Sequence, residues 1–218
     1  MHTLASDSFS AFPAFSAARS PRPLRWLIAA VASLALLAGC KDASAPAASK
    51  ISEPVSLSVI AAEAGGFSVG STMSARTVYV FFDAQCPHCG SLWDAAKPLK
   101  SQARFVWIPV GLLNPSSTSQ GATLLASADA AAAMDAHKTS LLAKQGGISA
   151  GPDIEAQKAV VAKNTALLNR FGFASIPTVV GTHAQTGALV TQEGAVPTAQ
   201  LAQLLGLQVP AGEAAGKP

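Results

Sequence analysis

Charged residues are scarce in this chain of 218 residues: they make up 12% of the sequence, and the formal net charge is +3. No run of lysine or arginine occurs after Lys41, and the mild basic balance owes much to the N-terminal segment. Proteins that bind nucleic acid through charge carry basic runs or patches. The low charge and the many alanines therefore argue against a nucleic-acid partner.

Cysteine is also scarce, with Cys40, Cys86 and Cys89 as the three examples. A zinc site usually needs a second pair of Cys or His ligands beside a CxxC pair, and the sequence has no second pair. A purely structural disulfide between Cys86 and Cys89 would close a ring too small to remove much chain entropy. Redox chemistry is therefore the leading interpretation of the pair, with metal binding and an inert disulfide as the alternatives.

The hydrophobic run near the N-terminus, Trp26–Ala38, is too short for a comfortable membrane span. Three arginines between residues 19 and 25 precede it, so the segment has the basic and apolar parts of a secretory signal peptide. The run ends in Leu37-Ala38-Gly39-Cys40, which resembles the bacterial lipobox. An ordinary signal peptide followed by a coincidental cysteine is the alternative.

The lipobox resemblance implies a signal peptide over residues 1–39 and lipidation of Cys40. Acyl chains on Cys40 would anchor the protein to a membrane without a spanning helix. Lys41 stands where such signals carry Asp for inner-membrane retention, which favours the outer membrane. The expected location is the periplasm, where disulfides persist.

About 180 residues follow the signal peptide, a length that suits one domain. Residues 42–54 are rich in Ala, Ser and Pro and read as a flexible tether. The predicted organisation is a tether over 40–54, one domain over 55–208 with a helical insertion at about 111–172, and a tail over 209–218.

The stretch Val78–Leu92 carries the chemistry. Thr77–Phe82 reads as a buried strand, and Pro87 suits the first turn of a helix. Cys86 should then lie at the helix N-terminus, where unpaired N–H groups and the helix dipole stabilise a thiolate and lower its pKa. His88 would favour the thiolate further. Cys89, one turn deeper, should act as the resolving thiol.

The remaining chain predicts further helices and strands around this unit. A helix after the motif should run to about Gln102 with a kink at Pro98. Val55–Ala64 could be a short strand or a helix. The other expected segments are a strand at Phe67–Met73, a strand at Phe105–Val110, a loop at Asn114–Ser119, helices at Gln120–Ser127 and at Ala130–Lys144 with Asp129 as cap, a helix at Ile154–Phe171 with Asp153 as cap, a strand after Pro177, a hairpin at Gly181–Gly187, a strand at Ala188–Gln192 and a helix at Pro197–Leu205.

The order of elements, together with Cys86-Pro87-His88-Cys89 and Ile176-Pro177, resembles the thioredoxin fold. The segment from Phe82 to Cys89 is similar to the active-site segment of the periplasmic disulfide-bond proteins of the DsbC/DsbG type. The resemblance implies an α/β fold with a helical insertion between the CxxC βα unit and a cis-Pro strand. On base rates alone Ile176–Pro177 would be trans; the resemblance favours cis.

Three departures from that family pattern stand out. Only about 35 residues separate Cys40 from the first core strand, too few for the family's dimerisation domain, so a monomer is expected. Ile176 replaces the usual Thr before the active-site Pro. Val80 stands where many relatives carry a buried acid, which leaves Asp83 as a candidate proton relay for Cys89, with capping or surface solvation as the alternatives.

The sequence thus predicts a thiol–disulfide oxidoreductase that acts on exported proteins, uses no cofactor or metal, and exchanges electrons with a membrane redox partner. Cys86, Cys89 and His88 are the expected catalytic residues, and the resemblance places Pro87, Ile176 and Pro177 in the substrate groove. The direction, whether oxidation, reduction or isomerisation, is left open. One alternative is a copper-handling lipoprotein that uses His183; the other is a structural lipoprotein with an inactive site.

Overall fold

The computed structural model describes residues 52–209 and 211, and it contains a five-stranded mixed sheet in the order β1-β3-β2-β4-β5. Strands β2 and β3 run parallel, and the other neighbouring pairs are antiparallel. The strands are β1 (Phe67–Gly70), β2 (Thr77–Asp83), β3 (Arg104–Val110), β4 (Thr178–Thr182) and β5 (Leu189–Glu193). The strands predicted from the sequence are confirmed, and β2 lies at the centre of the sheet.

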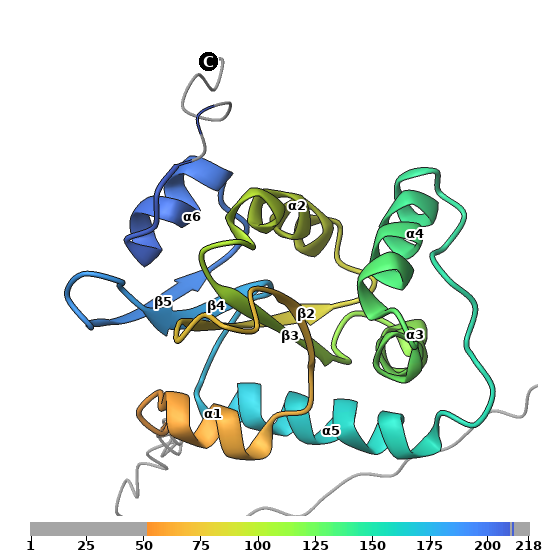
Figure 1. Cartoon of the computed structure of the whole chain (residues 1–218). Helices are drawn as coiled ribbons and strands as arrows, with labels where there is room; N and C mark the ends of the chain where they lie inside the picture. Colours follow the sequence, from red (N-terminus) through yellow and green to blue (C-terminus); the bar gives the residue numbers. More distant parts are fainter. Residues whose placement is uncertain (1–51, 210, 212–218) are drawn as a thin grey trace, which may run out of the picture. The chain divides into compact units, whose positions relative to one another are not determined.

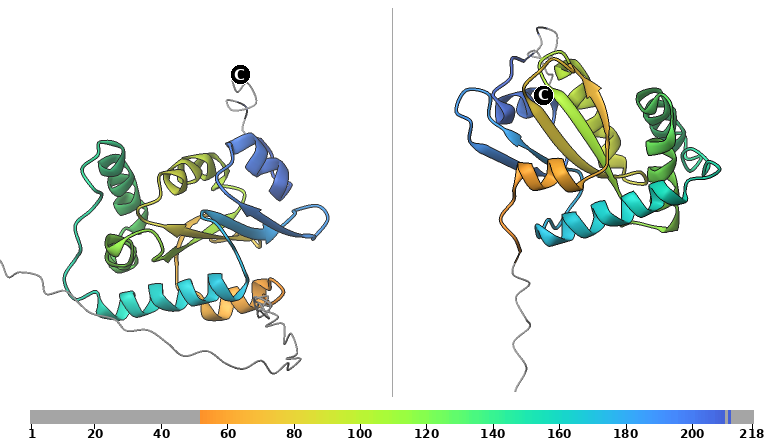
Figure 2. Two further views of the ribbon diagram at one scale, coloured as in Figure 1. Left: turned by 180° about the vertical axis from the view of Figure 1, so that it is seen from behind. Right: turned by 60° about the horizontal axis from the view of Figure 1, so that its bottom comes forward.

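Helices cover both faces of the sheet (Figure 1). Helices α2 (Pro87–Ala96) and α6 (Thr198–Leu205) lie on one face, and α1 (Leu57–Glu63) and α5 (Glu155–Arg170) lie on the other, as the views in Figure 2 also show. Helices α3 (Pro115–Ala126) and α4 (Ala130–Leu142) lie beside the sheet. Within the stretch predicted as a helical insertion, α3 and α4 thus stand to one side, while α5 forms part of a covering layer.

The alternation of side chains along β2 builds a core on each face of the sheet, because successive residues of a strand point to opposite sides. Val78, Val80 and Phe82 pack in one buried cluster with residues of α2 and α6. Phe81 belongs to the second cluster, with Ile60 of α1 and residues of α5. The strand that leads into the cysteine pair is therefore fixed from both sides.

Helix α3 begins five residues earlier than the sequence predicted, so the expected loop at Asn114–Ser119 is wrong. Asn114 caps the helix: its side-chain oxygen accepts the Ser116 N–H at 2.8 Å, and Ser117 Oγ accepts the Asn114 N–H at 3.2 Å. Pro115 occupies the first helical turn. A segment of Pro, Ser and Thr resembles a loop in composition, yet the same residues satisfy the free N–H groups of a helix start.

Two other helix boundaries differ from the prediction, and one cap is confirmed. The α-helix after the cysteine pair ends at Ala96, and Pro98 lies in a short 3₁₀ helix over Lys97–Leu99, instead of kinking a longer helix. Asp153 does not cap α5; it has a φ of 52° in the left-handed region, and Ile154 precedes the helix. Asp129 does cap α4, because its carboxylate accepts the Ala132 N–H at 2.9 Å.

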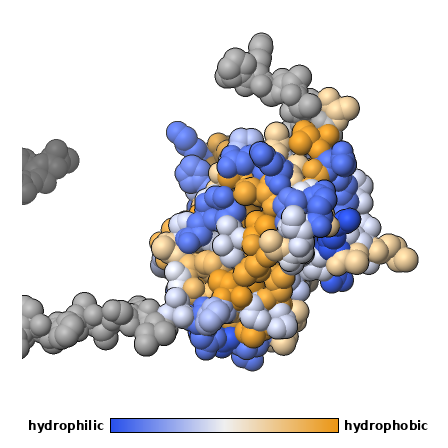
Figure 3. Space-filling view, turned by 90° about the vertical axis from the view of Figure 1, so that its left-hand side faces the viewer, coloured by the Kyte–Doolittle hydropathy of each residue, from blue (hydrophilic) through white to orange (hydrophobic). Residues whose placement is uncertain are grey.

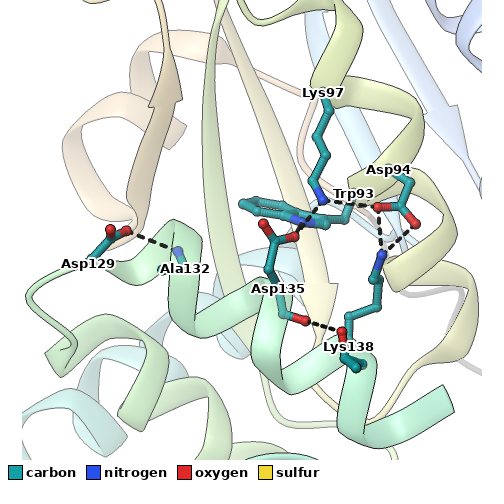
Figure 4. Close-up of polar contacts among 8 residues, drawn as sticks. Trp93, Asp94, Lys97, Asp129, Ala132, Asp135 and Lys138 are labelled. Atoms are coloured by element: carbon teal, nitrogen blue, oxygen red, sulfur yellow. Dashed lines mark hydrogen bonds and ion pairs between the residues drawn. The ribbon is translucent and has the colours of Figure 1, made fainter. Parts of the chain in front are cut away.

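Charged side chains fasten α4 to α2 at the surface (Figure 4). Asp135 of α4 accepts hydrogen bonds from Trp93 Nε1 at 2.6 Å and from Lys97 at 2.5 Å. Lys138 of α4 donates to both carboxylate oxygens of Asp94 at 2.7 Å. Partly exposed ion pairs contribute little individually, so this network orients α4 against α2 more than it stabilises the fold.

Figure 3 views the side from which the β4–β5 hairpin projects in Figure 1, and apolar surface there runs between polar regions. Strand β5 forms that edge of the sheet, and Leu189 is 49% exposed. In the part of the chain that the structure describes, no helix is both long and apolar enough to cross a membrane. The predicted signal peptide, the lipidation at Cys40 and nearly all of the tether lie outside the described residues.

Candidate thiol–disulfide site

The turn between β2 and α2 is organised by Asp83, the last residue of the strand. Its carboxylate is fully buried and accepts three backbone N–H groups: those of Gln85 at 2.8 Å, Leu112 at 2.7 Å and Leu113 at 3.0 Å. Its backbone carbonyl accepts the Cys86 N–H at 3.0 Å. Asp83 therefore joins the turn before Cys86 to the loop that follows β3; it neither caps α2, whose N-cap is Cys86, nor lies in solvent, the two alternatives named above. Its predicted role as a proton relay stays a prediction.

Cys86 occupies the N-cap position of α2, directly before Pro87 in the first turn. The side-chain hydrogen bond from the Cys89 thiol, helped by the backbone N–H groups of Cys89 and His88 and by the charge of His88, lowers the pKa of Cys86 to about 6, although burial acts in the opposite sense. The residue is 6% exposed. Donors aimed at one sulfur thus make Cys86 the more acidic thiol of the pair.

Cys89 lies one turn inside α2 and is fully buried. Burial strongly raises the pKa of Cys89, and the hydrogen bond with Cys86 and the negative charges of Cys86 and Asp83 act in the same direction. Both cysteines are free thiols in this structure. The two sulfurs therefore differ in protonation. Cys86 is ionised at neutral pH, whereas Cys89 keeps its proton and donates a hydrogen bond to the Cys86 thiolate.

The Ile176–Pro177 peptide bond is cis, which confirms the prediction made from the resemblance. The carbonyl oxygen of Ile176 lies 3.9 Å from Cys86 Sγ. Pro177 is buried, and its carbonyl oxygen accepts the Gly194 N–H at 2.8 Å. The structure thus brings Cys86 and the Ile176-Pro177 turn together across 90 positions of sequence.

A cleft of about 120 Å³ opens beside Cys86, between α2 and α4. Its walls include Pro87 from the motif and Met134, Leu141 and Leu142 from α4. Leu142 is 69% exposed, and Leu112 and Leu113, in the loop after β3, are also exposed. The reactive sulfur therefore lies at the border of apolar surface that a polypeptide could contact.

The residues that bond the turn before Cys86, at Ala84 and Gln85, were not predicted from the sequence. His137 of α4 is fully buried, and its Nε2 lies 2.6 Å from the carbonyl oxygen of Ala84. Gln120 of α3 hydrogen-bonds with Gln85, the residue before Cys86. A weak signal existed: His137 lies three positions after Met134 on the apolar face of a predicted helix, where an unpaired imidazole is costly to bury.

His183, the candidate ligand of the copper-handling alternative, lies away from the cysteines. It follows the end of β4, whereas Ile176 and Pro177 precede its start. Its Nδ1 accepts the N–H groups of Gln185 and Thr186 at 3.4 Å, so it serves the hairpin turn. Among the residues that the structure describes, no group of three or more His, Cys, Asp or Glu side chains is arranged to hold a metal ion. His183 is thus not placed to bind a metal ion together with Cys86 and Cys89.

A cysteine pair at the start of the helix that follows a central strand, facing a cis-proline turn, defines a thioredoxin-like protein. The chain belongs to the thioredoxin-like domain family, whose model matches residues 71–208. It is 33% identical over 145 residues to the thiol:disulfide interchange protein DsbG of Pseudomonas aeruginosa. The match covers 63% of this chain and 54% of that protein, so the chain spans about half the length of this curated relative.

Solved structures share the fold at lower sequence identity. A periplasmic thioredoxin-like protein from Salmonella enterica serovar Typhimurium is 16% identical, with a TM-score of 0.53 over 71% of this chain and 97% of that one. ScsC of Proteus mirabilis in a transitional conformation is 17% identical, with a TM-score of 0.52 over 71% of this chain and 80% of that one. These structures confirm the predicted thioredoxin-like α/β fold.

Proposed function

We propose that this protein is a thiol–disulfide oxidoreductase that acts on exported proteins through Cys86 and Cys89. The observation that carries the proposal is the unequal pair of sulfurs: Cys86 has a pKa of about 6 and lies beside the Ile176 carbonyl, while buried Cys89 keeps its proton. A thiolate is the nucleophile in disulfide exchange, and a protonated thiol nearby can complete the reaction.

The reaction proceeds in two exchanges. The Cys86 thiolate attacks one sulfur of a substrate disulfide, the substrate S–S bond breaks, and the leaving sulfur departs as a thiolate that takes up a proton. Cys89 then loses its proton and attacks the Cys86 sulfur of the mixed disulfide, which releases the second substrate thiol. The substrate gains two electrons and the Cys86–Cys89 pair loses them; the reverse sequence oxidises a substrate dithiol.

Each named residue of the site has a part in this scheme. His88 and the helix N-terminus stabilise the Cys86 thiolate, which stabilises the dithiol and makes the disulfide more oxidising. Pro87, Ile176 and Pro177 border the sulfur where substrate backbone would lie. Asp83 is the candidate proton relay for Cys89, and its carboxylate has an acceptor position left beside the three backbone N–H groups that it binds.

The site of action we propose is the periplasm, with a membrane protein that supplies or removes electrons. The relatives support this choice, since the Pseudomonas aeruginosa protein is named a thiol:disulfide interchange protein and the Salmonella structure a periplasmic thioredoxin-like protein. The anchor at Cys40, its outer-membrane sorting and the monomeric state remain part of the proposal. Radiolabelled fatty acid should enter the wild-type chain in bacteria and be absent from a Cys40→Ser variant.

Disulfide turnover tests the function. The wild-type protein should reduce insulin or a peptide disulfide in the presence of a thiol reductant, and the Cys86→Ser variant should fall to the uncatalysed rate. Cys40→Ser is the matched control, because it also replaces one cysteine by serine and should keep full turnover in solution. Full activity in Cys86→Ser, or no activity in the wild type, would refute the proposal.

A further inference from the structure

His137 holds the residue two positions before the reactive cysteine. Its Nδ1 accepts the backbone N–H of Ile148 at 3.1 Å, so the neutral ring carries its proton on Nε2 and donates it to the Ala84 carbonyl oxygen at 2.6 Å. The side chain is fully buried, and burial lowers the pKa of His137, which keeps the ring neutral. Both ring nitrogens are thus occupied by backbone groups, one on each side.

The backbone packs tightly against this imidazole. Gly147 has a φ of 88°, and a Cβ atom added there would lie 2.4 Å from His137 Cε1. Gly146 and Ile148, on either side, accept hydrogen bonds from Gln120 Nε2 at 2.8 and 2.9 Å. The segment 146–148 therefore clamps the ring in one orientation.

A second contact of the same support reaches Gln85. Its side-chain amide donates to the Gly146 carbonyl oxygen at 3.0 Å and also hydrogen-bonds with Gln120. The two residues that precede Cys86 are consequently both held by α3, α4 and the segment 146–148. The imidazole lines the same cleft as Cys86, but both of its ring nitrogens bond backbone groups, so it acts on the site through the backbone of the turn.

We propose that His137 is a positioning residue of the thiol–disulfide site, whose neutral imidazole fixes the Ala84 carbonyl and with it the turn that presents Cys86 to its hydrogen-bond donors. This inference deepens the proposed function and rests on it for its consequence in catalysis. The donors that stabilise the thiolate are the Cys89 thiol and the N–H groups of His88 and Cys89. Hydrogen bonds weaken steeply with distance and angle, so a small displacement of the turn weakens all of them together.

Variants can separate this role from ordinary support of the core. His137→Phe fills the space but can neither donate to Ala84 nor accept from Ile148. His137→Gln places an amide donor near the Nε2 position and can restore the bond to Ala84. Asn164→Leu is the matched control: Asn164 of α5 is also fully buried and also bonds backbone groups, namely Gly65 at 2.9 and 2.7 Å and the Pro109 carbonyl at 2.9 Å.

The test follows the ultraviolet absorbance of the Cys86 thiolate in the reduced full chain, with Cys40→Ser as the common background. The wild type and His137→Gln should titrate near pH 6. In His137→Phe the midpoint should rise, so that the thiolate fraction at pH 6 falls by about twofold or more. Its equilibrium with glutathione should shift toward the disulfide form. Asn164→Leu should lower the melting temperature and leave the midpoint unchanged.

The proposal is overturned if His137→Phe has a lower melting temperature than the wild type, as Asn164→Leu does, yet keeps the wild-type midpoint of the Cys86 titration. If His137→Phe does not fold, Gly147→Ala replaces it in the test, because the added Cβ displaces the imidazole while His137 remains. An unchanged midpoint of the Cys86 titration in Gly147→Ala contradicts the proposal as well. The titration needs no substrate. A wild type without disulfide turnover would therefore refute the proposed function alone, and an unmoved midpoint would refute the positioning role alone.

Discussion

Two regions meet at Cys86, and the chain builds them in different ways. Residues 83–89 are contiguous, and the strand end, the turn and the helix start follow directly from their order. The support beneath them comes from Gln120, His137 and Gly146, which lie between 35 and 61 positions away along the chain. The first region creates an acidic thiol, and the second fixes where that thiol stands. The chemistry of this site is therefore local, whereas its placement depends on residues far away in the sequence.

Removing the resolving thiol breaks the contiguous region and should have the largest effect. In Cys89→Ala the mixed disulfide at Cys86 cannot be resolved internally, so it should accumulate and turnover should fall to background. The pKa of Cys86 should also rise above about 6, since the Cys89 thiol is its strongest stabilising contact. Non-reducing electrophoresis with mass spectrometry measures the trapped adducts. Undiminished turnover would show that Cys89 has no part in the reaction.

Asp83→Asn tests how the contiguous region is attached to the loop after β3. The carboxylate accepts three backbone N–H groups inside the protein, and an amide offers one oxygen and introduces two donors there. We expect a loss of about 1–3 kcal/mol in the free energy of unfolding. Urea unfolding of the reduced protein measures it. An unchanged unfolding midpoint would mean that the loop after β3 is held by other contacts.

Asn114→Ala tests a contact on the supporting side of the site. Asn114 caps α3 and also donates from Nδ2 to the Gln85 side chain at 3.1 Å. Loss of the cap should cost about 1 kcal/mol. Because the backbone of the turn keeps its other contacts, the pKa of Cys86 should stay at its wild-type value. A variant that unfolds at the wild-type urea concentration would contradict the capping role.

Asp135→Asn should have the smallest effect of the series. Its partner Lys97 lies at the surface, where the Asp135 and Lys97 side chains are 49% and 38% exposed, whereas its other partner, Trp93, is buried. Exposed ion pairs contribute between zero and about 1 kcal/mol, and salt screens them. The free energy of unfolding should therefore be measured for the variant and the wild type at low and at high salt. The difference between the two proteins should become smaller as the salt concentration rises. A salt-independent loss would assign the effect to the Trp93 hydrogen bond.

The sequence was enough to place the cysteine pair, the central strand and the cis-proline turn. A β-branched and aromatic run followed by Cys86-Pro87 predicts a strand that ends at a helix start. The cis bond at Ile176-Pro177 was predicted from the family resemblance. Loop-like composition misled at Asn114–Ser119, because Asn, Pro and Ser favour turns and helix starts alike. Asp153 failed as a cap because its backbone enters the left-handed region, a conformation that composition does not encode.

The supporting residues could not be predicted from sequence for a different physical reason. His137 has no periodic pattern or motif that links it to Ala84, and the contact exists only because α4 is oriented against α2. Gln120 is one of several glutamines, and nothing in its neighbours marks it as the partner of Gln85. Long-range polar contacts depend on the packing of whole helices, so they become visible only in the structure.

Cys86 is ionised at neutral pH while Cys89 is not, and a thiolate titration of the reduced Cys40→Ser variant measures this difference. The folded pKa of Cys86 lies below its unfolded value, so the thiolate should appear as pH rises through about 6, and the stability that it gives the reduced form should be lost as pH falls through that value. A first ionisation near pH 6, with no second step until strongly alkaline conditions, is the predicted result. A first ionisation close to the ordinary cysteine value of about 8.5 would show that Cys86 is not a stabilised thiolate.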